Sequence, residues 1–117
     1  MKTPEQITNS LVKEFDKLND IREQSLKLSR EIIKSCSKSI RNVHRNNLDE
    51  AKQHLDEANK NYQDLRSSLK DIPELRFAGY VNDSERELIE AFLVFEFEKT
   101  NALLEFEGMN VSASNYI

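Results

Sequence analysis

The chain has 117 residues, of which 32% are charged and 38% hydrophobic, and its formal net charge is −4. This length suits one small domain, and only two Gly and two Pro leave little turn chemistry for a sheet protein. The low mean hydropathy of −0.70 predicts a thin core, so we expect long helices that assemble with further copies of the chain. The acidic balance excludes a globally basic nucleic-acid binder but allows a locally basic face.

Cysteine usage and apolar runs exclude further classes. Cys36 is the single cysteine, so no disulfide can form within the chain, and we expect Cys36 to pack in the core. No Cys/His cluster has zinc spacing. Charged residues interrupt the first 20 residues, unlike a signal peptide, and no apolar run approaches a membrane span. These features predict a cytoplasmic protein that does not enter a membrane.

The first predicted helix covers residues 4–45. Thr3 and Pro4 suit the N-cap and the first helical position, and Gln6 can close a capping box. Apolar residues then recur at steps of three, four and seven, which places them on one face. They are Ile7, Leu11, Phe15, Leu18, Ile21, Leu28, Ile32, Cys36, Ile40 and Val43. A helix of this length is unusual in a compact monomer.

The second predicted helix covers residues 48–70 and has the most regular pattern. We expect Asn47 to cap it, with Glu50 reaching back. The short link at Asn46 and Asn47 makes the first two helices antiparallel neighbours. The apolar residues alternate three- and four-residue steps, as in a coiled coil. They are Leu48, Ala51, Leu55, Ala58, Tyr62, Leu65 and Leu69.

A short connecting segment is predicted after the second helix. Pro73 disfavours helix at Ile72. Residues 75–81 are nevertheless too apolar for a free loop, so we expect them to pack around a short helical turn. Gly79 is the expected positive-φ residue.

The third predicted helix covers residues 84–106, with Ser84 as its N-cap and Glu87 as the capping-box partner. Apolar residues surround its axis, which is typical of a central helix. The other two helices have too little apolar surface to cover it. The predicted fold class is therefore all-α: an oligomerising, antiparallel bundle of three long helices with a short connecting segment.

Six basic residues share one face of the first helix, which we call the basic stripe. At about 100° per residue they fall within roughly 80° of one another, opposite the apolar face. They are Lys27, Arg30, Lys34, Lys38, Arg41 and Arg45. Such a row can track a phosphate backbone, and Ser29, Ser35, Ser37 and Ser39 could add hydroxyl donors. The alternative is a solvated face, or one paired with acidic residues of the second helix. No aromatic residue interleaves with the stripe to stack bases.

A pair of carboxylates, Glu87 and Glu90, is the second candidate site. At a spacing of three residues they share a helix face, and the apolar neighbours of Glu90 suggest an apolar environment. Two close carboxylates can hold Mg²⁺ or Mn²⁺, which can activate water at a phosphodiester. The alternatives are the capping role of Glu87 and a salt bridge from Glu90 to a neighbouring helix.

The chain resembles the family of translin and translin-associated factor X (TRAX) over nearly its whole length. No single motif is highly specific, and the order and spacing of several segments carry the likeness. These segments are Asp20–Glu23, Leu28–Ile33, Ser39–Arg45, Leu48–Ala51, Phe77–Val81 and Glu87–Ala91.

The resemblance implies an all-helical protomer, a hollow oligomer and single-stranded RNA or DNA bound inside it. For TRAX-like members it implies Mg²⁺-dependent endoribonuclease activity at two glutamates and an aspartate from a later helix. Glu87 and Glu90 match the two glutamates. The chain departs from the family by its length, because the tail Ser114–Ile117 resembles the start of the helix that would carry the aspartate. The third metal ligand and the later helices are thus missing, unless a partner chain supplies them.

Two functions follow from this sequence. The leading hypothesis is a truncated translin-like protein that binds single-stranded RNA or DNA, with a conditional nuclease activity. The alternative is a non-catalytic helical assembly module, or a subunit that needs a second chain to complete its fold and site.

Overall fold

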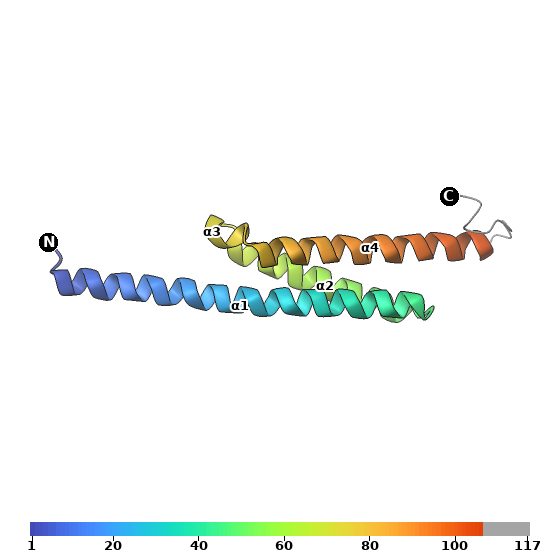
Figure 1. Ribbon diagram of the computed structural model, residues 1–117, viewed down its shortest axis with the longest axis horizontal. Coiled ribbons are helices and arrows are strands. Elements are labelled where there is room, and N and C mark those ends of the chain that lie inside the picture. Colours follow the sequence, from blue (N-terminus) through green and yellow to red (C-terminus); the bar gives the residue numbers. More distant parts are fainter. Residues whose placement is uncertain (107–117) are drawn as a thin grey trace.

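The computed structural model describes residues 1–106, and the side chains of residues 1–101. The described chain is all-helical, with α1 (Pro4–His44), α2 (Leu48–Leu69), α3 (Pro73–Arg76) and α4 (Gly79–Phe106). Figure 1 shows that α2 runs back along α1, and that α4 runs antiparallel to α2. The molecule is elongated, with extents of 78 × 24 × 16 Å. The predicted all-α class, with three long helices and a short helical connection, is therefore confirmed.

The start of α1 has the predicted capping box. The Gln6 backbone N–H donates to the Thr3 hydroxyl at 3.2 Å, and the Thr3 N–H donates to the Gln6 side chain at 2.9 Å. Pro4 occupies the first turn, where its missing N–H costs nothing.

The turn between α1 and α2 differs from the prediction in its chemistry. Asn46 takes a φ of 61°, a left-handed conformation that asparagine tolerates better than most residues. Asn47 stands at the N-cap position of α2, but its side chain makes no capping hydrogen bond. The expected capping box with Glu50 is therefore wrong. The Asn47 backbone N–H donates to the Asn42 carbonyl at 2.8 Å instead, which closes the turn.

The last long helix begins at Gly79, five residues before the predicted start at Ser84. Ser84 is fully buried inside the helix, and its hydroxyl donates to the Tyr80 carbonyl one turn earlier at 2.9 Å. The capping role of Ser84 and Glu87 is therefore wrong. The positive φ expected at Gly79 is also wrong, because Gly79 is the first residue of α4 and does not adopt a left-handed conformation.

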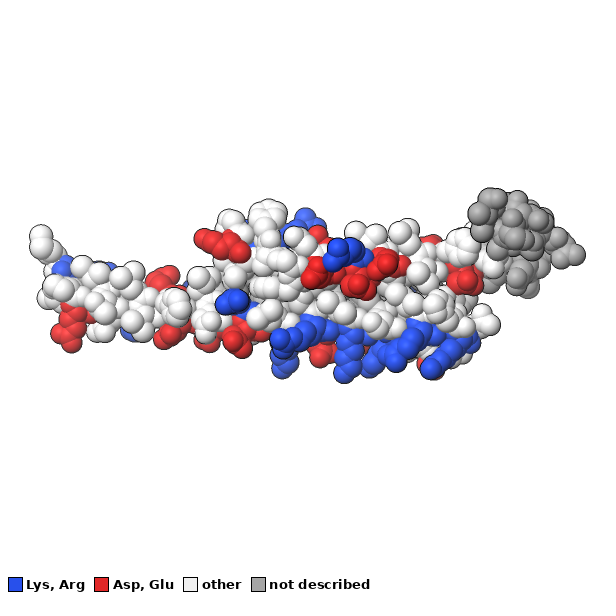
Figure 2. Space-filling view, in the orientation of Figure 1, with Lys and Arg blue, Asp and Glu red and all other residues white. Residues whose placement is uncertain are grey.

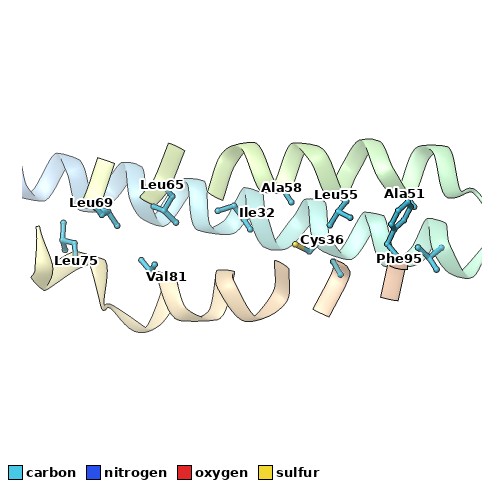
Figure 3. Packing of buried hydrophobic residues seen from close by; sticks show 12 residues of the cluster. Ile32, Cys36, Ala51, Leu55, Ala58, Leu65, Leu69, Leu75, Val81 and Phe95 are labelled. Atoms are coloured by element: carbon cyan, nitrogen blue, oxygen red, sulfur yellow. The ribbon is translucent and has the colours of Figure 1, made fainter. Parts of the chain in front are cut away.

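The core lies where α1, α2 and α4 meet (Figure 3). α1 contributes Ile32, Cys36 and Val43 to it, beside larger and smaller apolar residues of α2 and α4. The α1 face toward its neighbours includes the buried Ser25, Ser29, Ser35, Cys36 and Ser39. Small side chains allow helices to approach closely, and this face is what positions α1 against both partners. The prediction that Cys36 packs in the core is confirmed.

Two apolar surfaces remain uncovered in the described chain. Residues 4–20 of α1, here called the α1 extension, are all exposed, and Figure 1 shows this part projecting beyond the other helices. On the outer face of α4, Ile89, Phe92, Leu93 and Phe97 are 51–61% exposed. The expected central position of this helix is therefore wrong, because α1 and α2 cover it from one side only.

Candidate nucleic-acid interface

The basic stripe occupies the C-terminal half of α1. Five of its six side chains are exposed, and Lys38 is half-buried. Figure 2 shows a row of blue side chains projecting from one edge of α1, with a few red atoms among them. The α4 carboxylates lie across a band of uncharged atoms from this row. The stripe is thus a cationic ridge that a polynucleotide can reach from solvent.

The positions of the stripe residues around the α1 axis explain why their side chains are exposed to solvent. The buried residues Ile32, Cys36 and Val43 face α2 and α4, and the stripe lies roughly 180° away on the helix. Within the described residues the Lys and Arg ion pairs are Lys52–Asp56, Arg76–Glu85 and Arg86–Asp83, and none includes a stripe residue. The alternative of a stripe paired with α2 is not observed.

The serines expected beside the stripe point elsewhere. Ser29, Ser35 and Ser39 are buried against the other helices, and only Ser37 is exposed. The Ser39 hydroxyl donates to the Ala51 carbonyl of α2 at 2.8 Å. The Ser29 hydroxyl donates to the Tyr80 carbonyl of α4 at 2.7 Å and also contacts the Ser84 hydroxyl. The expectation of serine donors at a nucleic acid is therefore wrong for these three residues.

The two candidate carboxylates lie on one flank of α4, and they differ in environment. Glu87 is half-buried beside α1, whereas Glu90 is exposed, so the expected apolar environment of Glu90 is wrong. Burial, and secondarily the Glu87 carboxylate, raises the pKa of the Cys36 thiol from 9.0 to about 11. Glu87 thus lies close enough to α1 for its charge to act on Cys36. Neither glutamate belongs to an ion pair recorded among the described side chains.

No group of three or more His, Cys, Asp or Glu side chains that could hold a metal occurs in the described range. Glu87 and Glu90 are thus not joined by a third His, Cys, Asp or Glu side chain in that range. The tail Ser114–Ile117, which we expected to begin the next helix, lies outside the described residues.

A polar junction that the sequence analysis missed fixes the start of α4. The Tyr62 hydroxyl donates to Glu85 Oε1 at 2.7 Å, and Arg76 Nη1 lies 3.0 Å from the same oxygen. Burial and this hydrogen bond raise the pKa of Tyr62. The junction joins three consecutive elements, α2, α3 and α4, through residues on different helices, so the periodicity of any single helix gave no signal for it. It lies away from the stripe and has a structural role.

Comparison with known proteins gives one similarity of note. The chain is 32% identical over 111 residues to an uncharacterized protein of Methanocaldococcus jannaschii, covering 93% of this chain and 49% of the relative. The chain therefore spans about half the length of the relative that it matches. No family model matches the chain, and no solved structure matches it. Within the described range, no helix combines the length and apolar character needed to cross a bilayer.

Proposed function

We propose that this protein is a translin-like binder of single-stranded RNA or DNA, which contacts the phosphate backbone through the basic stripe. The observation that supports the proposal most strongly is the absence of carboxylate partners for the stripe in the described structure. Successive stripe residues are three or four positions apart, which spaces their charges by about 4.5–6 Å along the axis. A row of this kind neutralises successive phosphates and releases their counterions.

Charge reversal provides the test. The variant Arg30→Glu, Lys34→Glu and Arg41→Glu should weaken binding of a labelled single-stranded RNA by roughly tenfold or more at low salt. A matched control reverses three exposed cations on the α2 side, namely Lys60 and Arg66 of α2 and Lys70 directly after it. Both variants undergo the same change in net charge, so the control separates a local effect from general repulsion. Equal loss in both variants would contradict a role for the stripe.

We propose a conditional extension, in which Glu87 and Glu90 support Mg²⁺- or Mn²⁺-dependent endoribonuclease activity. Mg²⁺ commonly binds through one or two carboxylates together with waters and substrate phosphates. The two carboxylates on one flank of α4 are ligands of that chemical type. The metal, when bound, would activate water for attack on a phosphodiester. Glu87, half-buried, would hold its position through packing, while the exposed Glu90 faces the solvent from which RNA arrives.

The nuclease proposal is tested by following the cleavage of a labelled single-stranded RNA in the presence of Mg²⁺ or Mn²⁺. The same assay is run on the wild type and on the charge-reversal variant of the stripe. Cleavage by the wild type should be lost in Glu90→Gln and retained in Glu50→Gln, which removes an exposed carboxylate from α2. Mn²⁺ titration followed by calorimetry gives a second readout, because Glu90→Gln should also weaken metal binding. Cleavage that continues unchanged in Glu90→Gln would remove this residue from the mechanism.

The second candidate function is a helical assembly subunit without catalysis, and the outer face of α4 favours it. Four large apolar side chains are exposed there, beside a cleft of about 370 Å³ between α2 and α4. Exposed apolar patches of this kind mark interaction sites. The matched relative has about as much chain again beyond the matched half, so the fitting partner is a chain equivalent to that remaining half.

This candidate predicts that the remaining half of the Methanocaldococcus relative, produced separately, binds the chain. Leu93→Glu should abolish that binding, whereas Lys52→Glu, an exposed residue at the rim of the cleft, should retain it. Association that is insensitive to Leu93→Glu would exclude the outer face of α4. Self-association is also proposed, since the α1 extension leaves a second apolar surface uncovered.

A further inference from the structure

The α1 extension continues the inner face of α1 without a change of register. The buried positions Ser25, Ser29, Ile32, Cys36, Ser39 and Val43 alternate steps of four and three residues. The same alternation, followed toward the N-terminus, arrives at Arg22, Leu18, Phe15, Leu11, Thr8 and Pro4. The face that α2 and α4 cover in the second half of α1 is therefore uncovered in the first half.

The uncovered part of this face carries larger side chains than the covered part. Ile7, Leu11, Val12, Phe15 and Leu18 are 41–70% exposed, where the covered part has mainly serine and cysteine. Apolar residues at this spacing are the pattern by which one helix packs on another. Solvation alone would favour polar residues at these positions, because the rest of the extension is polar.

We infer that the α1 extension pairs in antiparallel orientation with the α1 extension of a second copy of this chain. The pairing is two-fold symmetric, so each copy offers the same surface and covers the same surface. The extension of a second copy has the required length and the required apolar face. The inference rests on the proposed self-association, and it is independent of nucleic-acid binding.

The heptad pattern and the length of the extension together select one register. In antiparallel coiled coils the a positions of one helix face the d positions of the other. Leu11 then faces the partner's Phe15, Thr8 faces the partner's Leu18, and Pro4 faces the partner's Arg22. A shift by one heptad toward the body would place the partner's Pro4 opposite Ser29, which the protomer already buries. The opposite shift would place Leu18 opposite the partner's Met1, before the partner's helix begins.

Arg22 supports this register. It is the single charged residue on the inner-face positions between Pro4 and Val43, and it belongs to none of the ion pairs recorded in the described structure. In the selected register it lies at the end of the paired helices, next to the partner's Glu5. A cation at that place can remain solvated and meet an acidic side chain, which a central position would not allow.

The first test is the solution mass, measured by sedimentation from about 1 to 100 µM, a range that covers weak specific interfaces. The wild type should be a dimer at the upper end, and Phe15→Glu should be a monomer at every concentration. Phe97→Glu, which places the same charge on the outer face of α4, should remain dimeric. Because Phe15 makes no contact with the body, its variant should keep the helix content and thermal unfolding of the monomer. A monomeric wild type, or a dimeric Phe15→Glu, would overturn the inference.

The second test reads the orientation with cysteine pairs in a Cys36→Ser background. Leu11→Cys and Phe15→Cys chains, mixed under oxidising conditions, should form a disulfide between the two different chains, since facing a and d positions lie within disulfide range. Each chain alone should cross-link much more slowly. Fast cross-linking of Leu11→Cys with itself indicates a parallel pair and contradicts the proposal, as does failure of the mixture to cross-link. RNA binding by the stripe is measured separately, so failure of either proposal leaves the other identifiable.

Discussion

The two halves of α1 have the same helical period, but the inner face of the second half is covered by other helices and that of the first half is exposed. In the second half, small residues such as Ser29 and Ser39 are buried, and their hydroxyls donate to carbonyls of α4 and α2. In the first half, large residues such as Leu11 and Phe15 are exposed. The comparison shows that the helical period defines the face in both halves, whereas the covering helices decide whether that face is buried. The covered half carries four serines beside Ile32, Cys36 and Val43, and the uncovered half carries leucine and phenylalanine without a neighbour in the described chain.

The largest expected contrast is between core truncations in the two regions. Leu65→Ala removes a fully buried side chain of α2 and should lower the free energy of unfolding by about 2–5 kcal/mol. Leu11→Ala should leave the unfolding of the monomer unchanged, because Leu11 lies in the uncovered extension. Urea denaturation at low protein concentration measures both. A comparable loss in Leu11→Ala would mean that the extension packs on its own protomer.

The next contrast is one of pH. The Cys36 thiol has a pKa raised to about 11 by burial and by Glu87. Since the raised value belongs to the folded state, the neutral thiol contributes stability that is complete below pH 9 and is lost as pH rises toward 11. The loss should reach roughly 2–3 kcal/mol.

Comparing the pH dependence of wild type with that of Cys36→Ala isolates this group from the tyrosines. The difference in unfolding free energy between the two proteins should change between pH 9 and 11 and be constant below pH 8. Parallel curves over the whole range would show that Cys36 is not held in its neutral form.

The smallest contrast concerns single hydroxyls. Ser39→Ala loses the hydrogen bond to the Ala51 carbonyl and should cost about 1 kcal/mol. Ser10→Ala, at an exposed position of the extension, should be neutral or slightly stabilising, because alanine has the higher helix propensity. Thermal unfolding of the two variants under identical conditions compares them. Equal effects would indicate that Ser39 is not specifically bonded in solution.

The sequence predicted the helices well where pattern and cap agree. Apolar periodicity and the Thr3–Gln6 capping box located α1, and the regular alternation in α2 located its buried face. The start of α4 was missed because Ser84 followed by Glu87 resembles a capping box, while the decisive contacts come from Ser29 and Tyr62 on other helices. Local residues cannot reveal bonds made by helices distant in sequence.

The sequence predicted which charged residues form the stripe, but not which neighbouring residues are buried. A helical wheel placed the six cations on one face, and no ion pair recorded among the described side chains joins that face to α2 or α4. The same wheel did not separate the buried serines from the exposed Ser37, because the covering helices decide which flank of α1 is hidden. Whether Glu87 and Glu90 hold a metal stays a prediction, as does the resemblance to translin.

The most direct test of the central claim is the salt dependence of binding to a labelled single-stranded RNA. If up to six stripe cations each neutralise a phosphate, the logarithm of the association constant should fall with the logarithm of salt concentration, with a slope of as much as about −4. The triple stripe reversal should make that slope clearly shallower, and the α2 control should leave it unchanged. Binding that is indifferent to salt between about 50 and 200 mM, or a slope that the stripe reversal does not alter, would contradict the account.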